Sequence, residues 1–177
     1  MKRFPAIFAA VLGALFVSGC ATHYQFGTTL SEDLCYVYVP TVRNESDQPD
    51  AARYLNQALR KEIRREGTLR MVPEDQATTR LDVVITKYEQ DAASYSKGST
   101  QDPNRYRMRL TASVSFTRIP RAQAGEQVAT PIWIKDDVRG DKTFSGGSET
   151  STFKLQCLPD VSKELAETIV DGCIGAW

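Results

Sequence analysis

Residues 105–117, RYRMRLTASVSFT, decide the fold, because apolar and polar side chains alternate along them without a break. Successive side chains of a strand point to opposite faces of its sheet, so this pattern predicts a strand with one buried and one solvated face. At about 3.3 Å per residue the strand is longer than most. Its apolar face holds Tyr106, Met108, Leu110, Ala112, Val114 and Phe116.

Other strands are expected on both sides of this one. Their apolar, β-branched and aromatic composition is typical of sheet segments. Polar segments rich in Gly, Ser and Pro separate them and predict loops. The expected strands cover 34–40, 80–89 and 128–144, with a short extended piece at 69–72, and the expected loops cover 90–103 and 145–152.

Two segments have helical patterns. Asp50 can cap a helix whose apolar residues recur at helical spacing until Gly67, and a second helix is expected from Pro159-Asp160 to Gly172. The resulting order, β-α-β-β-β-α, predicts an α+β fold. We expect a two-layer sandwich in which two helices pack on one face of a mostly antiparallel four-stranded sheet.

The N-terminus has the features of an export signal. Lys2 and Arg3 precede an uncharged apolar run over 4–17, which is shorter than the ~20 residues needed to span a bilayer. Small residues then precede Cys20, as in the lipobox of bacterial lipoproteins, where the Cys is acylated and becomes the first mature residue. An ordinary secretory signal is the alternative.

This interpretation divides the chain into a cleaved signal peptide (1–19), a lipidated tether (20–33) and one α+β domain (34–177). Acyl chains on Cys20 would anchor the domain to a membrane. Ala21, rather than Asp, follows the Cys, and the sorting rule for such lipoproteins then favours the outer membrane.

Composition and motifs argue against catalysis and against a nucleic-acid partner. The formal net charge is zero, whereas nucleic-acid-binding domains are commonly basic. The single histidine, His23, lies in the tether, and no nucleophile elbow, zinc-protease motif, P-loop or dinucleotide fingerprint is present. The spacing of Asp136, Asp137 and Asp141 does not match an EF-hand loop. We therefore expect no enzyme activity, no cofactor and no metal site.

Three cysteines of the domain could form one disulfide in an oxidising compartment. Cys157 and Cys173 flank the second predicted helix, which separates them by roughly 20 Å, whereas a disulfide needs Cα atoms within ~7 Å. This favours a bond from Cys35 to either Cys157 or Cys173. The alternative is that all three are small buried hydrophobic residues.

The polar face of the long strand carries Arg105, Arg107 and Arg109, spaced by roughly 7 Å. Such a row suits phosphate or carboxylate groups, which Arg binds in bidentate fashion. We expect these three residues to bind a ligand. The alternative is a solvated sheet face on which they pair with Asp or Glu, or protect a sheet edge.

The chain resembles the LPS-assembly lipoprotein family (LptE-type). The resemblance rests on Cys20, on HYQFG (23–27), on YVYVPTVRN (36–44), on the amphipathic helix with Leu55, Leu59 and Arg60, and on RLDVVITKY (80–88). It implies two helices on a mostly antiparallel four-stranded sheet. No motif of the family falls on Arg105, Arg107 or Arg109.

The resemblance also implies a role and a place. Such a lipoprotein is lipid-anchored at the cell outer membrane, on the periplasmic side or within the lumen of a β-barrel translocon that it plugs and stabilises. Its partners would be that barrel, lipopolysaccharide and the membrane. The alternative is a lipoprotein adaptor or scaffold of another cell-envelope or secretion complex.

Overall fold

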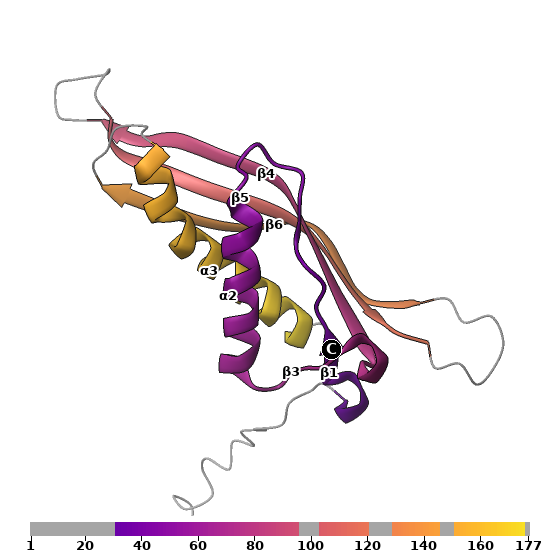
Figure 1. Cartoon of the computed structure of the whole chain (residues 1–177). Helices are drawn as coiled ribbons and strands as arrows, with labels where there is room; N and C mark the ends of the chain where they lie inside the picture. The colour runs from indigo at the N-terminus through magenta and orange to yellow at the C-terminus, as the bar shows by residue number, and fades with distance from the viewer. Residues whose placement is uncertain (1–30, 96–102, 121–128, 146–150, 176–177) are drawn as a thin grey trace, which may run out of the picture.

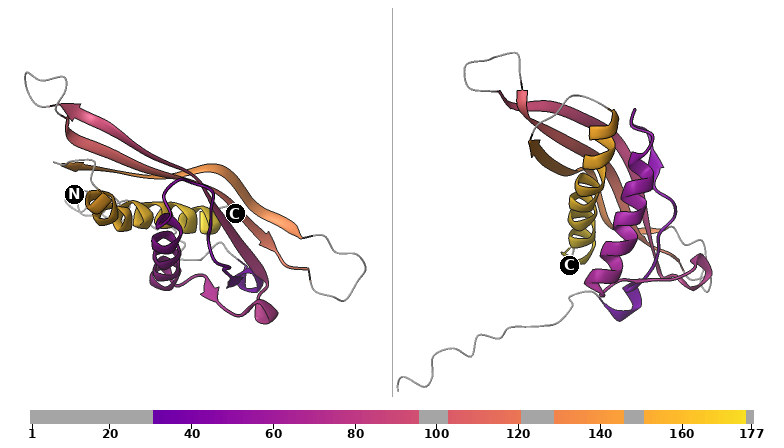
Figure 2. Two further views of the ribbon diagram at one scale, coloured as in Figure 1. Left: turned by 45° about the horizontal axis from the view of Figure 1, so that its top comes forward. Right: turned by 60° about the vertical axis from the view of Figure 1, so that its left-hand side comes forward.

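The computed structural model describes residues 31–95, 103–120, 129–145 and 151–175. Both helices cover the same face of a long twisted sheet (Figures 1 and 2). The expected signal peptide, Cys20 and His23 lie outside the described residues. In chain order the elements are η1 (Glu32–Leu34), β1 (Tyr36–Tyr38), β2 (Arg43–Asn44), α2 (Ala51–Glu66), β3 (Arg70–Met71), η2 (Glu74–Gln76), β4 (Thr79–Tyr95), β5 (Pro103–Arg118), β6 (Thr130–Ser145) and α3 (Ser151–Gly175).

The α+β class is confirmed, but the expected four-stranded, mostly antiparallel sheet is wrong. The sheet has six strands and is mixed: its order is β3-β1-β4-β5-β6, and β2 pairs with β4. The long strands β4, β5 and β6 are antiparallel, whereas β1 is parallel to β3 and β4. Parallel neighbours need a crossover of a dozen or more residues, and α2 supplies it between β1 and β3.

The alternation along β5 is confirmed. Each apolar residue from Tyr106 to Phe116 is at most 8% exposed and faces the helices. The helices contribute the other half of this core, mainly Leu55, Leu59 and Ile63 from α2 and Val161, Leu165 and Ile169 from α3.

Two predicted boundaries are wrong. The strand expected to end at residue 89 continues to Tyr95, because its polar end is held by pairing with β5 rather than by burial. The second helix begins at Ser151 and runs through Pro159. Cys157 and Leu158 are buried, so the apolar face of α3 extends before the proline and packing outweighs the lost backbone hydrogen bond.

Two glycines shape the helix layer. Gly67 ends α2 in the left-handed region, at φ 85°, and its N–H donates to the Ile63 carbonyl at 3.1 Å. Gly140 of β6 lies directly beneath α3, where a Cβ atom would stand 2.5 Å from the Leu165 backbone nitrogen. The absence of a side chain at residue 140 therefore allows α3 to approach the sheet.

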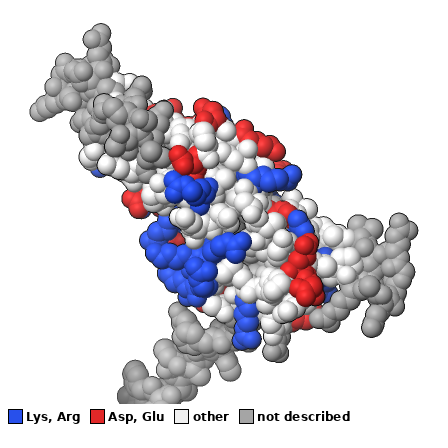
Figure 3. Space-filling model, viewed as in Figure 1, with Lys and Arg blue, Asp and Glu red and all other residues white. Residues whose placement is uncertain are grey.

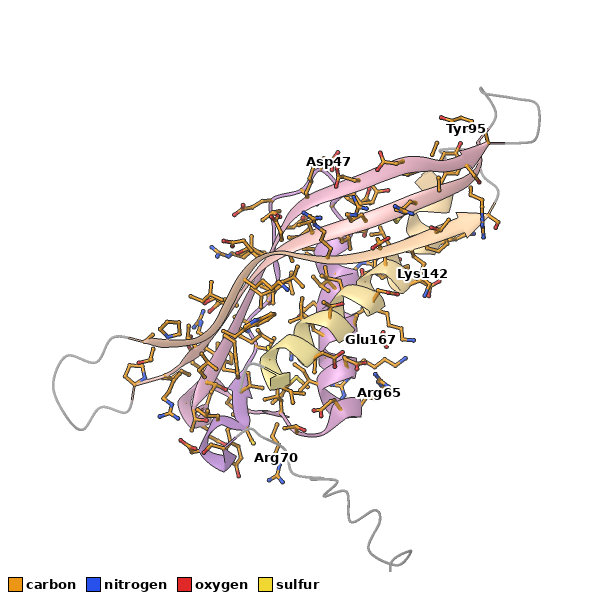
Figure 4. The ribbon with its side chains drawn as sticks, turned by 180° about the vertical axis from the view of Figure 1, so that it is seen from behind. Asp47, Arg65, Arg70, Tyr95, Lys142 and Glu167 are labelled. Carbon is orange, nitrogen blue, oxygen red and sulfur yellow. The ribbon has the colours of Figure 1, made fainter. Side chains whose placement is uncertain are left out.

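An ion network joins the two helices. Glu62 of α2 is 5% exposed, and both of its carboxylate oxygens accept hydrogen bonds from Arg65. The Arg65 side chain also reaches Glu167 of α3, at 3.6 Å, and the two point toward one another in Figure 4. Lys163 approaches the same Glu167 carboxylate at 3.7 Å.

Candidate functional site

The sheet face away from the helices is the open face. Seen from behind, β4, β5 and β6 lie in front of both helices (Figure 4). Strand register places mostly polar and charged side chains here. The open face includes Asp82, Lys87, Glu89 and Asp91 of β4, Arg105, Arg107, Arg109, Thr111 and Ser113 of β5, and Arg139, Asp141 and Thr143 of β6.

The structure places all three arginines of the row on the open face, but in different surroundings. Arg107 lies 3.7 Å from the Asp141 carboxylate, and Arg109 lies 3.7 Å from the Glu89 carboxylate. Arg105 is exposed opposite Ser145, and no ion pair joins it to another described residue. Two members therefore match the alternative of a sheet face with paired charges, and only Arg105 stands apart from carboxylates.

A hollow of about 440 Å³ opens on this face. Two β-bulges flank it. The β4–β5 register shifts between Ile85 and Lys87, where Thr86 is the extra residue, and the β5–β6 register shifts at Asp137, whose φ is 60°. Bulges redirect side chains and are common beside functional sites. The hollow is lined by Thr86, Lys87, Glu89, Arg109, Thr111, Asp137 and Arg139.

Cations outnumber carboxylates in the hollow. Lys87 donates to Glu89 at 2.7 Å, and this hydrogen bond is the main cause that lowers the pKa of Glu89. The charges of Lys87, Arg109 and Arg139 lower that pKa further. Glu89 is therefore ionised at neutral pH among three cations, and the hollow as a whole retains a net positive charge with Asp137 included.

Lys87 and Arg139 were not predicted from the sequence as site residues. Both residues lie in expected strands, 80–89 and 128–144, but no pattern set them apart from the other polar residues of these strands. The bulges place both residues opposite Thr111, two positions along β5 from Arg109, and leave no clear mark in the hydrophobic pattern. The alternation K-Y-E-Q-D over 87–91 was the one signal that the strand continues.

The expected disulfide from Cys35 to Cys157 or Cys173 is not formed in the structure. Cys157 and Cys173 are buried free thiols of α3. Burial raises the pKa of Cys173 to about 12, and burial, followed by the charge of Asp160, raises the pKa of Cys157. Cys35 is half-buried, and its Sγ donates to the Ser31 carbonyl at 3.6 Å. Cys157 and Cys173 thus match the alternative of small buried hydrophobic residues.

Two further observations concern metals and membranes. In the parts of the chain that the structure describes, no three His, Cys, Asp or Glu side chains gather closely enough to hold a metal ion. Asp136 instead accepts a hydrogen bond from Ser113 at 2.6 Å. Within the same residues, no helix has both the length and the apolar character needed to cross a membrane.

The mixed sheet with two helices on one face is an α+β fold that is also seen in a solved structure. The hypothetical protein CT253 from Chlamydia trachomatis shares it with a TM-score of 0.51 and 10% identity, over 79% of this chain and 98% of that chain. Rare lipoprotein B from Shewanella oneidensis has a TM-score of 0.39 and 14% identity, over 76% of this chain and 91% of that chain. The PelC dodecamer from Paraburkholderia phytofirmans has a TM-score of 0.42 and 12% identity, over 84% of this chain and 92% of that chain.

The family is shown by sequence. The profile of the LptE family, described as Lipopolysaccharide-assembly, matches residues 36–171, which span nearly the whole described domain. The chain therefore belongs to the LptE lipopolysaccharide-assembly family, and the expected resemblance is confirmed. No curated protein matches the sequence.

Proposed function

We propose that this protein is an outer-membrane lipoprotein, anchored through Cys20, that acts without catalysis in the transport of lipopolysaccharide to the cell surface. In this proposal it plugs a β-barrel translocon and binds lipopolysaccharide. The family match over residues 36–171 carries the proposal. The lipobox-like sequence that ends at Cys20 supports the anchor and the membrane.

The shape and polarity of the sheet support the plug. The lumen of a large membrane barrel is polar, so a protein that fills it needs polar surfaces on a rigid body. The antiparallel strands β4, β5 and β6 pair along most of their lengths and present the charged open face. Behind them, a continuous apolar core joins the sheet to both helices. Such a body can keep its shape while its outer surface contacts a polar wall.

The open face supports the binding of a phosphorylated glycolipid. Arg107 and Arg109 stand 3.7 Å from their carboxylates, beyond a normal hydrogen bond, so an incoming phosphate can compete for them. Arg109 also lines the hollow beside Lys87 and Arg139. We propose that phosphates of lipopolysaccharide bind along the arginine row and in the hollow, where the oxygen of the exposed Thr86 hydroxyl can accept a hydrogen bond from a sugar group.

Binding is tested with three variants of the mature protein. The first replaces Arg105, Arg107 and Arg109 by Ser, and the second is Lys87→Gln/Arg139→Gln. The matched control replaces the exposed Arg53, Arg64 and Arg118 by Ser, which removes the same charge as the first from α2 and from the helix side of the sheet. One lost charged hydrogen bond corresponds to roughly tenfold in affinity, so we expect at least about that loss in the first two variants.

The affinity of the control variant shows whether binding depends on the open face or only on net charge. Equal losses in all three variants would mean that only net charge matters. Unchanged affinity in the first two, with the folded far-UV spectrum retained, would exclude the open face as the binding surface.

The translocon role needs a cellular test. Depletion of the protein should remove lipopolysaccharide from the surface, and a pull-down from solubilised outer membrane should recover a large barrel. Normal surface lipopolysaccharide, with recovery of other envelope or secretion components, would instead favour an adaptor or scaffold.

A further inference from the structure

A second basic surface lies over α2, in the helix layer, and reaches the edge of the sheet at Arg70, which register turns toward the same sheet face as Tyr36. It covers the C-terminal half of α2 and the residue that begins β3, and we call it the α2 basic patch: Arg60, Lys61, Arg64 and Arg70. All four side chains are exposed. Positions 60, 61 and 64 fall on one face of the helix. Figure 3 shows Lys and Arg gathered over this part of α2.

The charges of this patch are not balanced by nearby carboxylates. In the described parts of the chain, no ion pair joins any of its four members to Asp or Glu. Of the nearest acidic residues, Glu62 is buried and bonded to Arg65, and Glu66 accepts hydrogen bonds from the Thr68 N–H and hydroxyl at 2.8 and 2.7 Å. By contrast, Arg107 and Arg109 of the open face each have a carboxylate neighbour. The α2 basic patch is therefore available to an external anion.

The patch lies where the described chain begins. Tyr36 pairs with Arg70 in the sheet, and the Arg70 N–H donates to the Cys35 carbonyl at 2.7 Å. Arg70 and Tyr95 mark opposite ends of the molecule in Figure 4. Eleven peptide units connect Cys20 to Ser31. Fully extended, they span at most about 40 Å, so a lipid on Cys20 would hold this end of the domain near the membrane.

An apolar hollow adjoins the cations. It has a volume of about 300 Å³ and includes Arg60 in its lining, together with Tyr38, Val39, Met71, Val72 and Pro73. The Arg60 guanidinium donates to the Val39 carbonyl at 3.2 Å, which keeps the charge beside the hollow. Cations next to aromatic and apolar side chains are typical of surfaces that rest at the headgroup level of a bilayer.

We propose that the α2 basic patch docks on the anionic phospholipid headgroups of the leaflet that holds the Cys20 lipid. The inference rests on the lipid anchor of the proposed function but not on the translocon or on lipopolysaccharide. Attraction to an anionic surface falls off within a Debye length, about 8 Å at physiological salt, so only the membrane-facing end of the domain takes part. Docking fixes the orientation of the long strands relative to the membrane.

The modification rate of Lys61 tests the proposal directly. The mature lipidated protein is placed in vesicles of phosphatidylcholine or of phosphatidylcholine with phosphatidylglycerol, and each lysine is labelled with an amine-reactive reagent and followed by mass spectrometry. We expect the labelling rate of Lys61 to fall several-fold in anionic vesicles only, and to recover at about 1 M salt. Lys135 of β6, also exposed, is the internal control and should react equally in both.

Variants assign the protection to the patch. Arg60→Gln/Arg64→Gln/Arg70→Gln should abolish the protection of Lys61, whereas Arg43→Gln/Arg53→Gln/Arg118→Gln, with the same charge change, should retain it. Equal labelling of Lys61 in both vesicles overturns the proposal, as does protection by lipopolysaccharide without protection by phosphatidylglycerol. Flotation with neutral vesicles checks the anchor separately. A protein that does not float lacks the anchor and overturns this inference, while one that floats without protection overturns docking alone.

Discussion

Replacing Gly140 by Ala tests how α3 rests on the sheet. The new Cβ would stand 2.5 Å from the Leu165 nitrogen and 2.7 Å from its Cα and Cβ, whereas ordinary contact begins at 3.4 Å. The atoms in conflict belong mostly to helix backbone, so α3 itself has to move outward by about 0.9 Å. A radial gap of this size forfeits a quarter to a half of each dispersion contact that it opens.

The cost can be estimated from Leu165, which is fully buried. A buried Leu makes 40–60 contacts of ~0.1–0.2 kcal/mol each, so losing a quarter of them costs about 2 kcal/mol. Ala loses less backbone conformational entropy than Gly on folding, which stabilises a strand by roughly 0.5–1 kcal/mol. The net loss is about 1–1.5 kcal/mol, in the usual range for overpacking. With a urea dependence of ~2 kcal/mol/M, the unfolding midpoint should fall by roughly 0.5–0.75 M.

Equilibrium urea unfolding, followed by far-UV circular dichroism, measures this change. Gly175→Ala is the matched control, because a Cβ there meets nothing within 4 Å, and its free energy of unfolding should stay within about 0.5 kcal/mol of the parent value. The reasoning is refuted if Gly140→Ala unfolds at the parental midpoint or later with an unchanged urea dependence. In that case α3 does not press on residue 140.

Three further experiments test other features. Arg65→Met should destabilise the fold more than Glu62→Gln, because the first leaves a buried carboxylate without its partner and the second leaves an exposed guanidinium in water. Urea unfolding midpoints of the two variants compare these losses, and the reverse order would contradict the ion network. Gly67→Ala should lower the free energy of unfolding by about 1 kcal/mol, because residue 67 has a φ of 85°, which a side chain disfavours. An unchanged melting temperature in thermal unfolding would contradict this. Burial raises the pKa of Cys173 and of Tyr88 to about 12, so each favours folding below its ordinary pKa and loses that contribution as pH rises toward 12. Unfolding midpoints measured from pH 8 to 11 should therefore fall, and less steeply in Tyr88→Phe.

The antiparallel part of the fold could be predicted from sequence, because burial imprints alternation on the chain. Residues 105–117 alternate strictly, and every apolar member faces the core. The parallel part could not be predicted from alternation, since β1, β2 and β3 have only two or three residues each. The helix between β1 and β3 was nevertheless visible, and a crossover of that length could have suggested parallel pairing.

The candidate site was predictable only in part, for a similar reason. Strand period placed Arg105, Arg107 and Arg109 on one face, but strand period does not reveal cross-strand neighbours. Asp141 and Glu89 come opposite the row through register, and the register depends on two bulges. The α2 basic patch could be recognised from the sequence only as part of an amphipathic helix that carries Arg60. Only the structure shows that the described residues provide no carboxylate to pair with these cations.

The parallel position of β1 has a consequence for the order in which the chain folds. Strands β4, β5 and β6 and helix α3 are contiguous and pair with their neighbours along the chain, so they can assemble without β1. Strand β1 has to wait for β4, since the Thr78 hydroxyl meets the Tyr36 carbonyl across 42 residues. Contacts between distant residues carry the larger loop-closure cost and form late. We therefore expect the N-terminal end of the described domain to be the last part to become structured. Under the proposed function, acylation of Cys20 and membrane sorting would then act on a chain in which this end is not yet folded.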